Sequence, residues 1–192
     1  ATPEYRKVVA GLSFFALFNS SDIFLLLSTK ETIGKEVLIL FGTTFNADTI
    51  TIAAYVFYNL VYAAMSYPLG ALADKISFRT IIIFGFSIFT AVYAGFAFNP
   101  SIPVIFILFF LYGVYAAATE GVIKAWVTNL AHRENTATAI GLYTSCESIC
   151  ALCASIIAGA IWMNWGSFYT FIIPAVIALL TLIYFSLIPS RK

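Results

Sequence analysis

Four ionisable residues lie inside long apolar stretches of this 192-residue chain, namely Asp22, Glu120, Lys124 and Glu147. Charged side chains in apolar surroundings are costly, and they usually face a partner or a water-filled space. Glu120 and Lys124 are four residues apart, so they share one face of a helix. Two interpretations of this pair are open: the charges exchange partners during a functional cycle, or they form an internal ion pair that neutralises itself.

The positions of these residues along their segments place two of them near the middle. A helix rises about 1.5 Å per residue, so Glu120 and Glu147 each lie roughly 15 Å from one end of their segments. Asp22 lies roughly 21 Å along its own segment and follows the polar run Asn19-Ser20-Ser21. We expect Glu120, Lys124 and Glu147 to face a shared polar space, and we expect a structural or gating role for Asp22 more than a binding role.

A polar stripe is formed by Tyr55, Asn59 and Tyr62, which follow i, i+4, i+7 spacing. Side chains at this spacing lie on one side of a helix, so Tyr55 and Asn59 are candidates to line the same polar space. The alternative is that the stripe serves helix packing, which is the commoner role of tyrosines at this spacing.

Three cysteines cluster in one apolar segment, and Cys150 and Cys153 have C-x-x-C spacing. Small residues surround them, so we interpret them as packing residues. A zinc site needs more ligands nearby, and the single histidine of the sequence, His132, lies in a predicted loop. We therefore expect neither a metal nor a cofactor.

The composition indicates which solvent surrounds the chain. Hydrophobic residues make up 61% of it and charged residues 10%, whereas a soluble domain has about 25% charged residues. One core in a protein of this size cannot bury so much apolar surface, so the sequence predicts that membrane lipid surrounds the chain. The net charge of +1 provides no basic surface for phosphates, which argues against nucleic acid as a partner.

Six apolar segments are long enough to cross a bilayer, which requires roughly 20 residues. The sequence therefore predicts an all-α membrane protein with six transmembrane helices, at residues 8–28, 51–71, 80–98, 104–130, 137–162 and 168–188. The segments lack the alternation that is typical of membrane barrel strands. Between the first two, the apolar run 37–41 is too short to span, and we interpret it as an interfacial segment or an outward extension of the second helix.

The basic residues predict the orientation of the chain, because cytoplasmic loops retain positive charge. With a cytoplasmic N-terminus, seven basic residues lie inside, namely Arg6, Lys7, Lys75, Arg79, Arg133, Arg191 and Lys192. Lys30 and Lys35 then lie outside, next to acidic residues. We therefore predict that both termini are cytoplasmic.

The loop between the second and third predicted helices has a distinctive sequence: Gly70-Ala71-Leu72-Ala73-Asp74-Lys75-Ile76-Ser77-Phe78-Arg79. It resembles the signature loop of the major facilitator superfamily, in which glycine, leucine, aspartate and a basic residue precede a second glycine and a basic cluster. The sequence departs from that pattern in places. Ser77 stands where the family usually has glycine, and Phe78 and Thr80 stand where it has basic residues.

The resemblance assigns Gly70, Asp74, Lys75 and Arg79 to a cytoplasmic gate loop. Gly70 permits two helices to approach closely. Asp74 can accept hydrogen bonds from a helix N-terminus or pair with Arg79. Such contacts can latch one state of a gate and break in the other.

The resemblance covers nearly the whole chain and implies the C-terminal six-helix half of a secondary transporter with about twelve helices. Each half of this fold contains two three-helix inverted repeats. The first, second, fourth and fifth helices of a half line a cavity for a small-molecule substrate, while the third and sixth lie towards lipid. The two halves rock to give alternating access, and a protonatable Glu120 or Glu147 would couple transport to a proton gradient. The implied location is the cell membrane, as a multi-pass protein of the bacterial inner membrane.

Other functions remain open for such a half. Its partner is an N-terminal six-helix half on the same polypeptide or a second copy of the chain, and a start at Ala1 without Met favours the first. A non-transporting scaffold or receptor could keep the same fold. An intramembrane protease needs a nucleophilic serine and a helix-borne base, and a lone His132 in a loop does not supply one, so we expect no enzyme.

Overall fold

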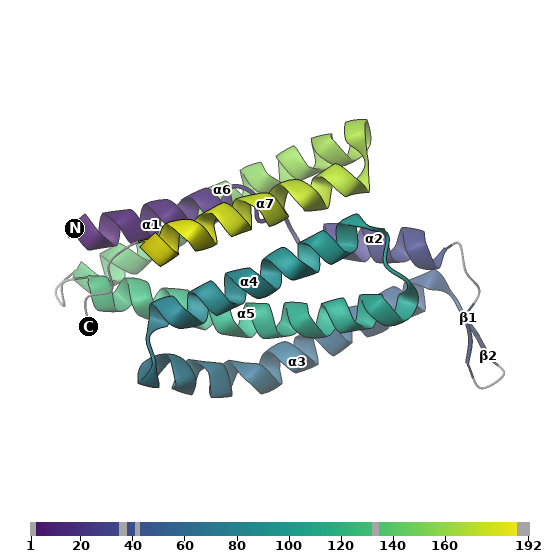
Figure 1. Cartoon of the computed structure of the whole chain (residues 1–192), viewed down its shortest axis with the longest axis horizontal. Helices are drawn as coiled ribbons and strands as arrows, with labels where there is room; N and C mark the ends of the chain where they lie inside the picture. Colours follow the sequence, from purple (N-terminus) through teal and green to yellow (C-terminus); the bar gives the residue numbers. More distant parts are fainter. Residues whose placement is uncertain (1–2, 35–37, 41–42, 132–134, 188–192) are drawn as a thin grey trace.

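The computed structural model describes residues 3–34, 38–40, 43–131 and 135–187, which form a bundle of long helices (Figure 1). The elements follow one another along the chain as α1 (Pro3–Ala16), α2 (Ile23–Ile33), β1 (Leu38–Leu40), β2 (Thr43–Phe45), α3 (Ala47–Lys75), α4 (Phe78–Ala97), α5 (Ile102–Leu130), α6 (Thr136–Trp165) and α7 (Ser167–Leu187). Local signals start several helices: the Asn46 side chain accepts a hydrogen bond from the backbone of Thr49 at the start of α3, and Pro103 lies in the first turn of α5.

Five of these helices are long and apolar enough to cross a membrane, namely α3, α4, α5, α6 and α7. They correspond to the predicted segments 51–71, 80–98, 104–130, 137–162 and 168–188. Each contains at least 20 residues, which matches the thickness of a bilayer core. The chain is therefore a helical membrane protein with multiple spans.

The first predicted helix is different, because residues 8–28 do not form one continuous helix. The structure has α1 of 14 residues and α2 of 11 residues, separated by residues 17–22. Ser, Asn and Asp side chains compete with helix formation by bonding to nearby backbone groups. The backbone of Ile23 donates such a bond to Ser21 Oγ, and α2 starts directly after Asp22. The polar run in the sequence thus breaks the helix instead of lying within it.

The region between α2 and α3 contains a short antiparallel hairpin. Strands β1 and β2 pair with Leu38 opposite Phe45 and Leu40 opposite Thr43. Residues 38–40 of the predicted run are therefore strand and do not extend the second helix, whereas their interpretation as an interfacial segment stays a prediction. Val37 and Phe41 lie outside the described residues. The hairpin is flanked by an ion pair of 2.7 Å between Lys30 of α2 and Asp48 of α3.

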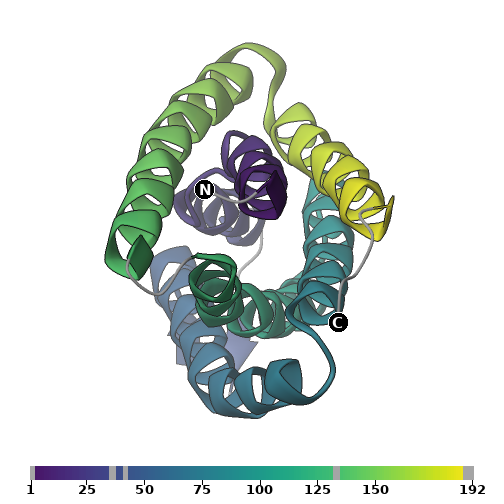
Figure 2. The ribbon, with the colours of Figure 1, turned by 90° about the vertical axis from the view of Figure 1, so that its left-hand side faces the viewer.

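The helices pack around α5, which lies against both α3 and α4, while α4 packs against α7. Seen along the bundle, α1 lies among α5, α6 and α7 (Figure 2). A glycine permits the closest approach of α3 to α5: a Cβ at Gly113 would lie 2.8 Å from the backbone oxygen of Tyr58. Small residues at such crossings are typical of membrane helices.

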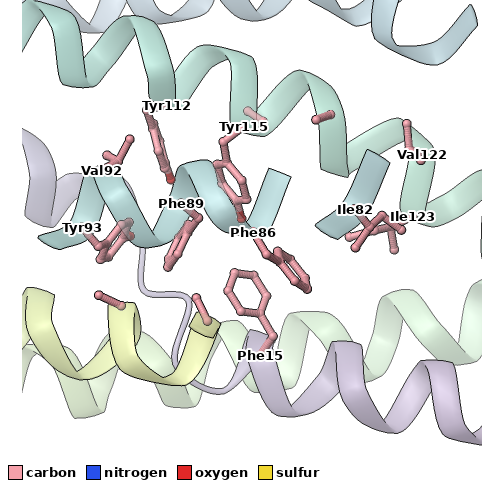
Figure 3. Packing of buried hydrophobic residues seen from close by; sticks show 14 of the residues in the cluster. Phe15, Ile82, Phe86, Phe89, Val92, Tyr93, Tyr112, Tyr115, Val122 and Ile123 are labelled. Carbon is pink, nitrogen blue, oxygen red and sulfur yellow. The ribbon is translucent and has the colours of Figure 1, made fainter. Parts of the chain in front are cut away.

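Aromatic side chains fill the centre of the bundle and hold α1 in place (Figure 3). The ring of Phe15 lies 4.4 Å from that of Phe86 and 5.0 Å from that of Phe89, both on α4. Phe89 in turn stacks on Tyr93 with 4.0 Å between the ring centroids. These contacts fix the end of α1, next to the break, against the core of the bundle.

The start of α1, the end of α7 and the turn from α3 to α4 lie at one end of the bundle (Figure 1). The end of α2, the hairpin and the turn from α6 to α7 lie at the other. Among the basic residues used for the orientation, Lys35, Arg133, Arg191 and Lys192 lie outside the described residues. The described ones follow the predicted division between the two ends, and the side that faces the cytoplasm stays a prediction.

Candidate functional site

A cavity of about 410 Å³ lies within the bundle, between α1, α3, α5 and α6. The link of residues 17–22 also contributes to it, whereas none of the lining residues comes from α4 or α7. All four ionisable residues singled out in the apolar segments line this cavity, namely Asp22, Glu120, Lys124 and Glu147. The structure therefore brings together residues that lie on three separate elements.

The three carboxylates of the cavity share one kind of partner, a tyrosine hydroxyl. Asp22 accepts a hydrogen bond from Tyr112 at 2.6 Å, Glu120 from Tyr62 at 2.8 Å and Glu147 from Tyr143 at 3.0 Å. A hydroxyl orients a carboxylate without neutralising its charge. The acids are therefore held in place while their charge remains available to a bound group.

The break in the first helix places Asp22 at the cavity. Asp22 occupies the N-cap position of α2, but its side chain makes no capping bond to the helix backbone. Its carboxylate instead reaches Tyr112 in the middle of α5. Next to it, the Asn19 amide donates to the Tyr115 hydroxyl at 3.4 Å, while Asn19 Oδ1 is buried and finds no hydrogen-bond partner among the described residues.

The internal ion pair between Glu120 and Lys124 does not form. Among the described residues the salt bridge is Lys30 with Asp48, outside the cavity. Glu120 instead accepts a hydrogen bond from the hydroxyl of Tyr62 on α3 and does not pair with Lys124 on its own helix. Glu120 and Lys124 are both exposed in this chain and line the cavity on its open side.

The predicted stripe on α3 separates into different roles. Asn59 donates to the backbone oxygen of Tyr55 within the helix, and Tyr55 is 40% exposed. Neither residue is among those that line the cavity in the described part of the chain, so their assignment to a transport site stays a prediction. Tyr62 bonds Glu120, and the residue on α3 that does line the cavity is Tyr58.

Sequence reasoning missed the tyrosines that line the cavity, which are Tyr58, Tyr112, Tyr115 and Tyr143. A signal was present, since a tyrosine inside an apolar helix needs a partner for its hydroxyl. Tyr112 and Tyr115 precede Glu120 on the same helix, and Tyr143 precedes Glu147 by four residues. Helical spacing could have matched Tyr143 with Glu147, but it could not have matched Tyr112 with Asp22, which lies 90 positions away.

The gate loop makes other contacts than the sequence predicted. Arg79 donates to the backbone oxygens of Phe185 at 2.6 Å and Ser186 at 2.5 Å, at the end of α7. Ser77 caps α4 by accepting a bond from the backbone of Thr80. Asp74 therefore neither pairs with Arg79 nor caps that helix.

Two further residues of the loop are open to their surroundings. Asp74 and Lys75 are exposed. At Gly70, a Cβ atom added to the backbone would have no described neighbour within 4 Å. Within the described part of the chain no other helix approaches Gly70 closely, and its role in a gate loop stays a prediction. Gly70 and Asp74 instead line a second cavity of about 250 Å³ beside α5.

A bundle of membrane-length helices around a cavity with charged side chains defines a multi-pass membrane protein. Comparison with known protein families identifies the family. Residues 9–192 match the Major Facilitator Superfamily, and the chain belongs to this family. This confirms the resemblance drawn from the loop at residues 70–79.

Two curated relatives support the assignment. An uncharacterised MFS-type transporter of Methanocaldococcus jannaschii is 33% identical over 83% of this chain and 38% of its own length. The multidrug efflux pump LfrA of Mycolicibacterium smegmatis is 29% identical over 65% of this chain and 25% of its own length. The aligned region thus spans well under half of the length of either relative.

Proposed function

We propose that this chain is one six-helix half of a secondary active transporter that moves a small solute by alternating access. The observation that carries the proposal is the cavity with three carboxylates and one lysine among membrane-length helices. Exposed charges at this depth cost several kcal/mol against lipid, so a second half must cover the open side of the cavity.

The sixth span of this half is the interrupted pair α1 and α2. At about 1.5 Å per residue, their 14 and 11 residues extend roughly 21 Å and 16 Å, which together are long enough to cross a bilayer core of about 30 Å. The two helices follow one another along the bundle (Figure 1). A broken membrane helix is tolerated where protein or a polar cavity surrounds the break, and residues 17–22 meet this condition.

With this span counted, the half consists of two three-helix repeats of inverted topology. The first contains α1–α2, α3 and α4, and the second contains α5, α6 and α7. The cavity-lining elements α1, α3, α5 and α6 are then the first two members of each repeat. This division supports the lining that the family resemblance implied.

The partner is a second six-helix half, either the N-terminal half of the same polypeptide or a second copy of this chain. This chain aligns with 38% of the length of the first relative, so that relative has room for a second half on the same polypeptide, and this supports a covalent partner. Asp74 is exposed and lines the second cavity. A contact between Asp74 and the partner half would hold the two halves together on the cytoplasmic side. We place the protein in the cell membrane with both termini cytoplasmic.

Protonation of Glu120 or Glu147 is the proposed coupling step. Each acid has a neutral tyrosine as its hydrogen-bond partner, so a proton changes the charge of the cavity without breaking an ion pair. A carboxylate that alternates between charged and neutral forms would favour different states of the cavity. The proton gradient could drive the solute in this way.

Reconstitution tests this function. The complete protein that contains this chain is placed in vesicles with a trapped pH dye, and a panel of solutes is added. We expect at least one solute to drive proton flux, and we expect Glu120→Gln to abolish that flux while exposed Glu31→Gln keeps it. Full flux in Glu120→Gln at normal protein levels would refute the coupling role, and solute binding without any movement would identify a receptor.

A further inference from the structure

The charges of the cavity do not balance. Among the described residues of this chain, three carboxylates and one ammonium line it, and the three acids accept their hydrogen bonds from neutral tyrosines. With all four groups ionised, the lining carries a net charge of minus two. An excess of one sign in a cavity with low-dielectric walls concentrates ligands of the opposite sign.

Aromatic rings stand beside Asp22, which is half-buried and accepts a hydrogen bond from Tyr112. The ring of Tyr112 lies 5.1 Å from that of Tyr58 and 5.4 Å from that of Tyr115, and all three line the cavity. Phe15 lines the same space from α1. The face of an aromatic ring attracts a cation, and the attraction strengthens where water is excluded. Rings and a carboxylate together are suited to a cation that carries apolar groups.

A third observation concerns Asn19 at the break between α1 and α2. Its Oδ1 is buried without a hydrogen bond, although Asn19 lines the cavity and its amide nitrogen bonds Tyr115. A buried acceptor without a donor is unfavourable. A ligand that carries an N–H group offers that donor once the side chain turns towards the cavity.

We propose that this cavity binds an apolar organic cation, with its charge against Asp22 and its hydrocarbon groups between Tyr58, Tyr112 and Tyr115. The volume of about 410 Å³ is that of a site for a drug-sized molecule. As a statement of what is transported, this proposal rests on the proposed function. As a statement of what is bound, it rests on the side of the cavity that this chain contributes. It assigns to Asp22 a binding role in addition to its place at the helix break.

Two ions of the same shape and opposite charge test the proposal. Binding of tetraphenylphosphonium and of tetraphenylborate is measured by equilibrium dialysis on the complete purified protein in detergent, with neutral triphenylphosphine oxide as a third probe. We expect saturable binding of the phosphonium, at least about tenfold tighter than that of the other two. Equal binding of the borate would show that apolar character alone is recognised, and it would overturn the proposal.

Variants locate the bound charge. We expect Asp22→Asn to weaken phosphonium binding about tenfold or more, while Glu31→Gln, exposed and outside the cavity lining, leaves it unchanged. We expect Tyr112→Leu to weaken binding more than Tyr112→Phe, which keeps the ring. If Asp22→Asn fails to fold, the comparison of the two Tyr112 variants still decides the matter, and equal affinities of those two would count against the ring contact.

The transport assay separates this proposal from the proposed function. Phosphonium binding without movement across a vesicle membrane would keep the cation site and refute the transporter. Transport of another solute without any phosphonium binding would keep the transporter and refute the cation site.

Discussion

The hydroxyl of Tyr112 donates a 2.6 Å hydrogen bond to Oδ1 of Asp22, although the two residues are 90 positions apart. The contact joins the middle of α5 to the start of α2 across the cavity. It replaces the backbone capping bond that an aspartate at this position usually makes. The orientation of Asp22 is therefore set by a distant helix, and the break between α1 and α2 is tied to the core.

Removal of that hydroxyl should destabilise the protein. We expect Tyr112→Phe to lower the free energy of unfolding by about 1–2 kcal/mol, because the Asp22 carboxylate then loses its partner in a partly buried position. Thermal unfolding of the purified protein measures the change. The matched control is Tyr67→Phe, a tyrosine that is 84% exposed. Equal midpoints for the two variants would show that the bond contributes nothing.

Two glycines of α5 should respond in opposite ways to the same substitution. A Cβ at Gly113 would lie 2.8 Å from both the Tyr58 backbone oxygen and the Val61 Cβ, whereas nothing lies within 4 Å of one at Gly121. We expect Gly113→Ala to cost about 1–3 kcal/mol because the backbone of α3 must shift. Gly121→Ala should be neutral or slightly stabilising, since alanine favours helix. If the two variants unfold at the same temperature, α3 and α5 do not pack as closely as described.

The Arg79 side chain should hold the end of α7. Its guanidinium bonds two backbone oxygens, those of Phe185 and Ser186. We expect Arg79→Lys to increase hydrogen exchange in the last turn of α7, because lysine lacks the planar pair of donors. Lys75→Gln on the same loop is the control, since Lys75 is exposed and should leave that exchange unchanged. Unaltered exchange in Arg79→Lys would contradict the capping role.

Asp74 should matter for transport and little for the stability of this half. It is exposed and forms neither of the two contacts predicted for it. We expect Asp74→Asn to change the free energy of unfolding by less than about 0.5 kcal/mol, as exposed substitutions usually do. The same variant should slow transport if Asp74 contacts the partner half. A large loss of stability with normal transport would reverse this assignment.

The spans could be predicted from the sequence because a long apolar run has few alternatives in lipid. The break at residues 17–22 was not predicted, although its polar residues were visible. Hydropathy averages over a window, while the break depends on local bonds such as the one from Ile23 to Ser21. The hairpin at Leu38–Phe45 was missed for a related reason, since a run too short to span does not specify helix or strand.

The membership of the site was predicted better than its contacts. The cavity is lined by all four ionisable residues of the apolar segments, namely Asp22, Glu120, Lys124 and Glu147. A charged side chain in an apolar segment is costly unless it faces a partner or a polar space, so its position could be predicted. Helical spacing left an ion pair of Glu120 with Lys124 open, whereas the structure pairs Glu120 with Tyr62, 58 positions away. Such partners depend on which helices pack together, and one sequence does not show that.

The central claim is that the charged cavity is a water-accessible route inside a membrane bundle, and thiol labelling in membranes tests it directly. In a protein whose native cysteines, including Cys146, Cys150 and Cys153, are replaced by alanine, Ser148→Cys places a thiol on the cavity lining of α6. Val176→Cys places one on the outer face of α7, where the side chain is 50% exposed. We predict that a hydrophilic thiol reagent modifies the first and spares the second. Modification of the second with protection of the first would contradict the account.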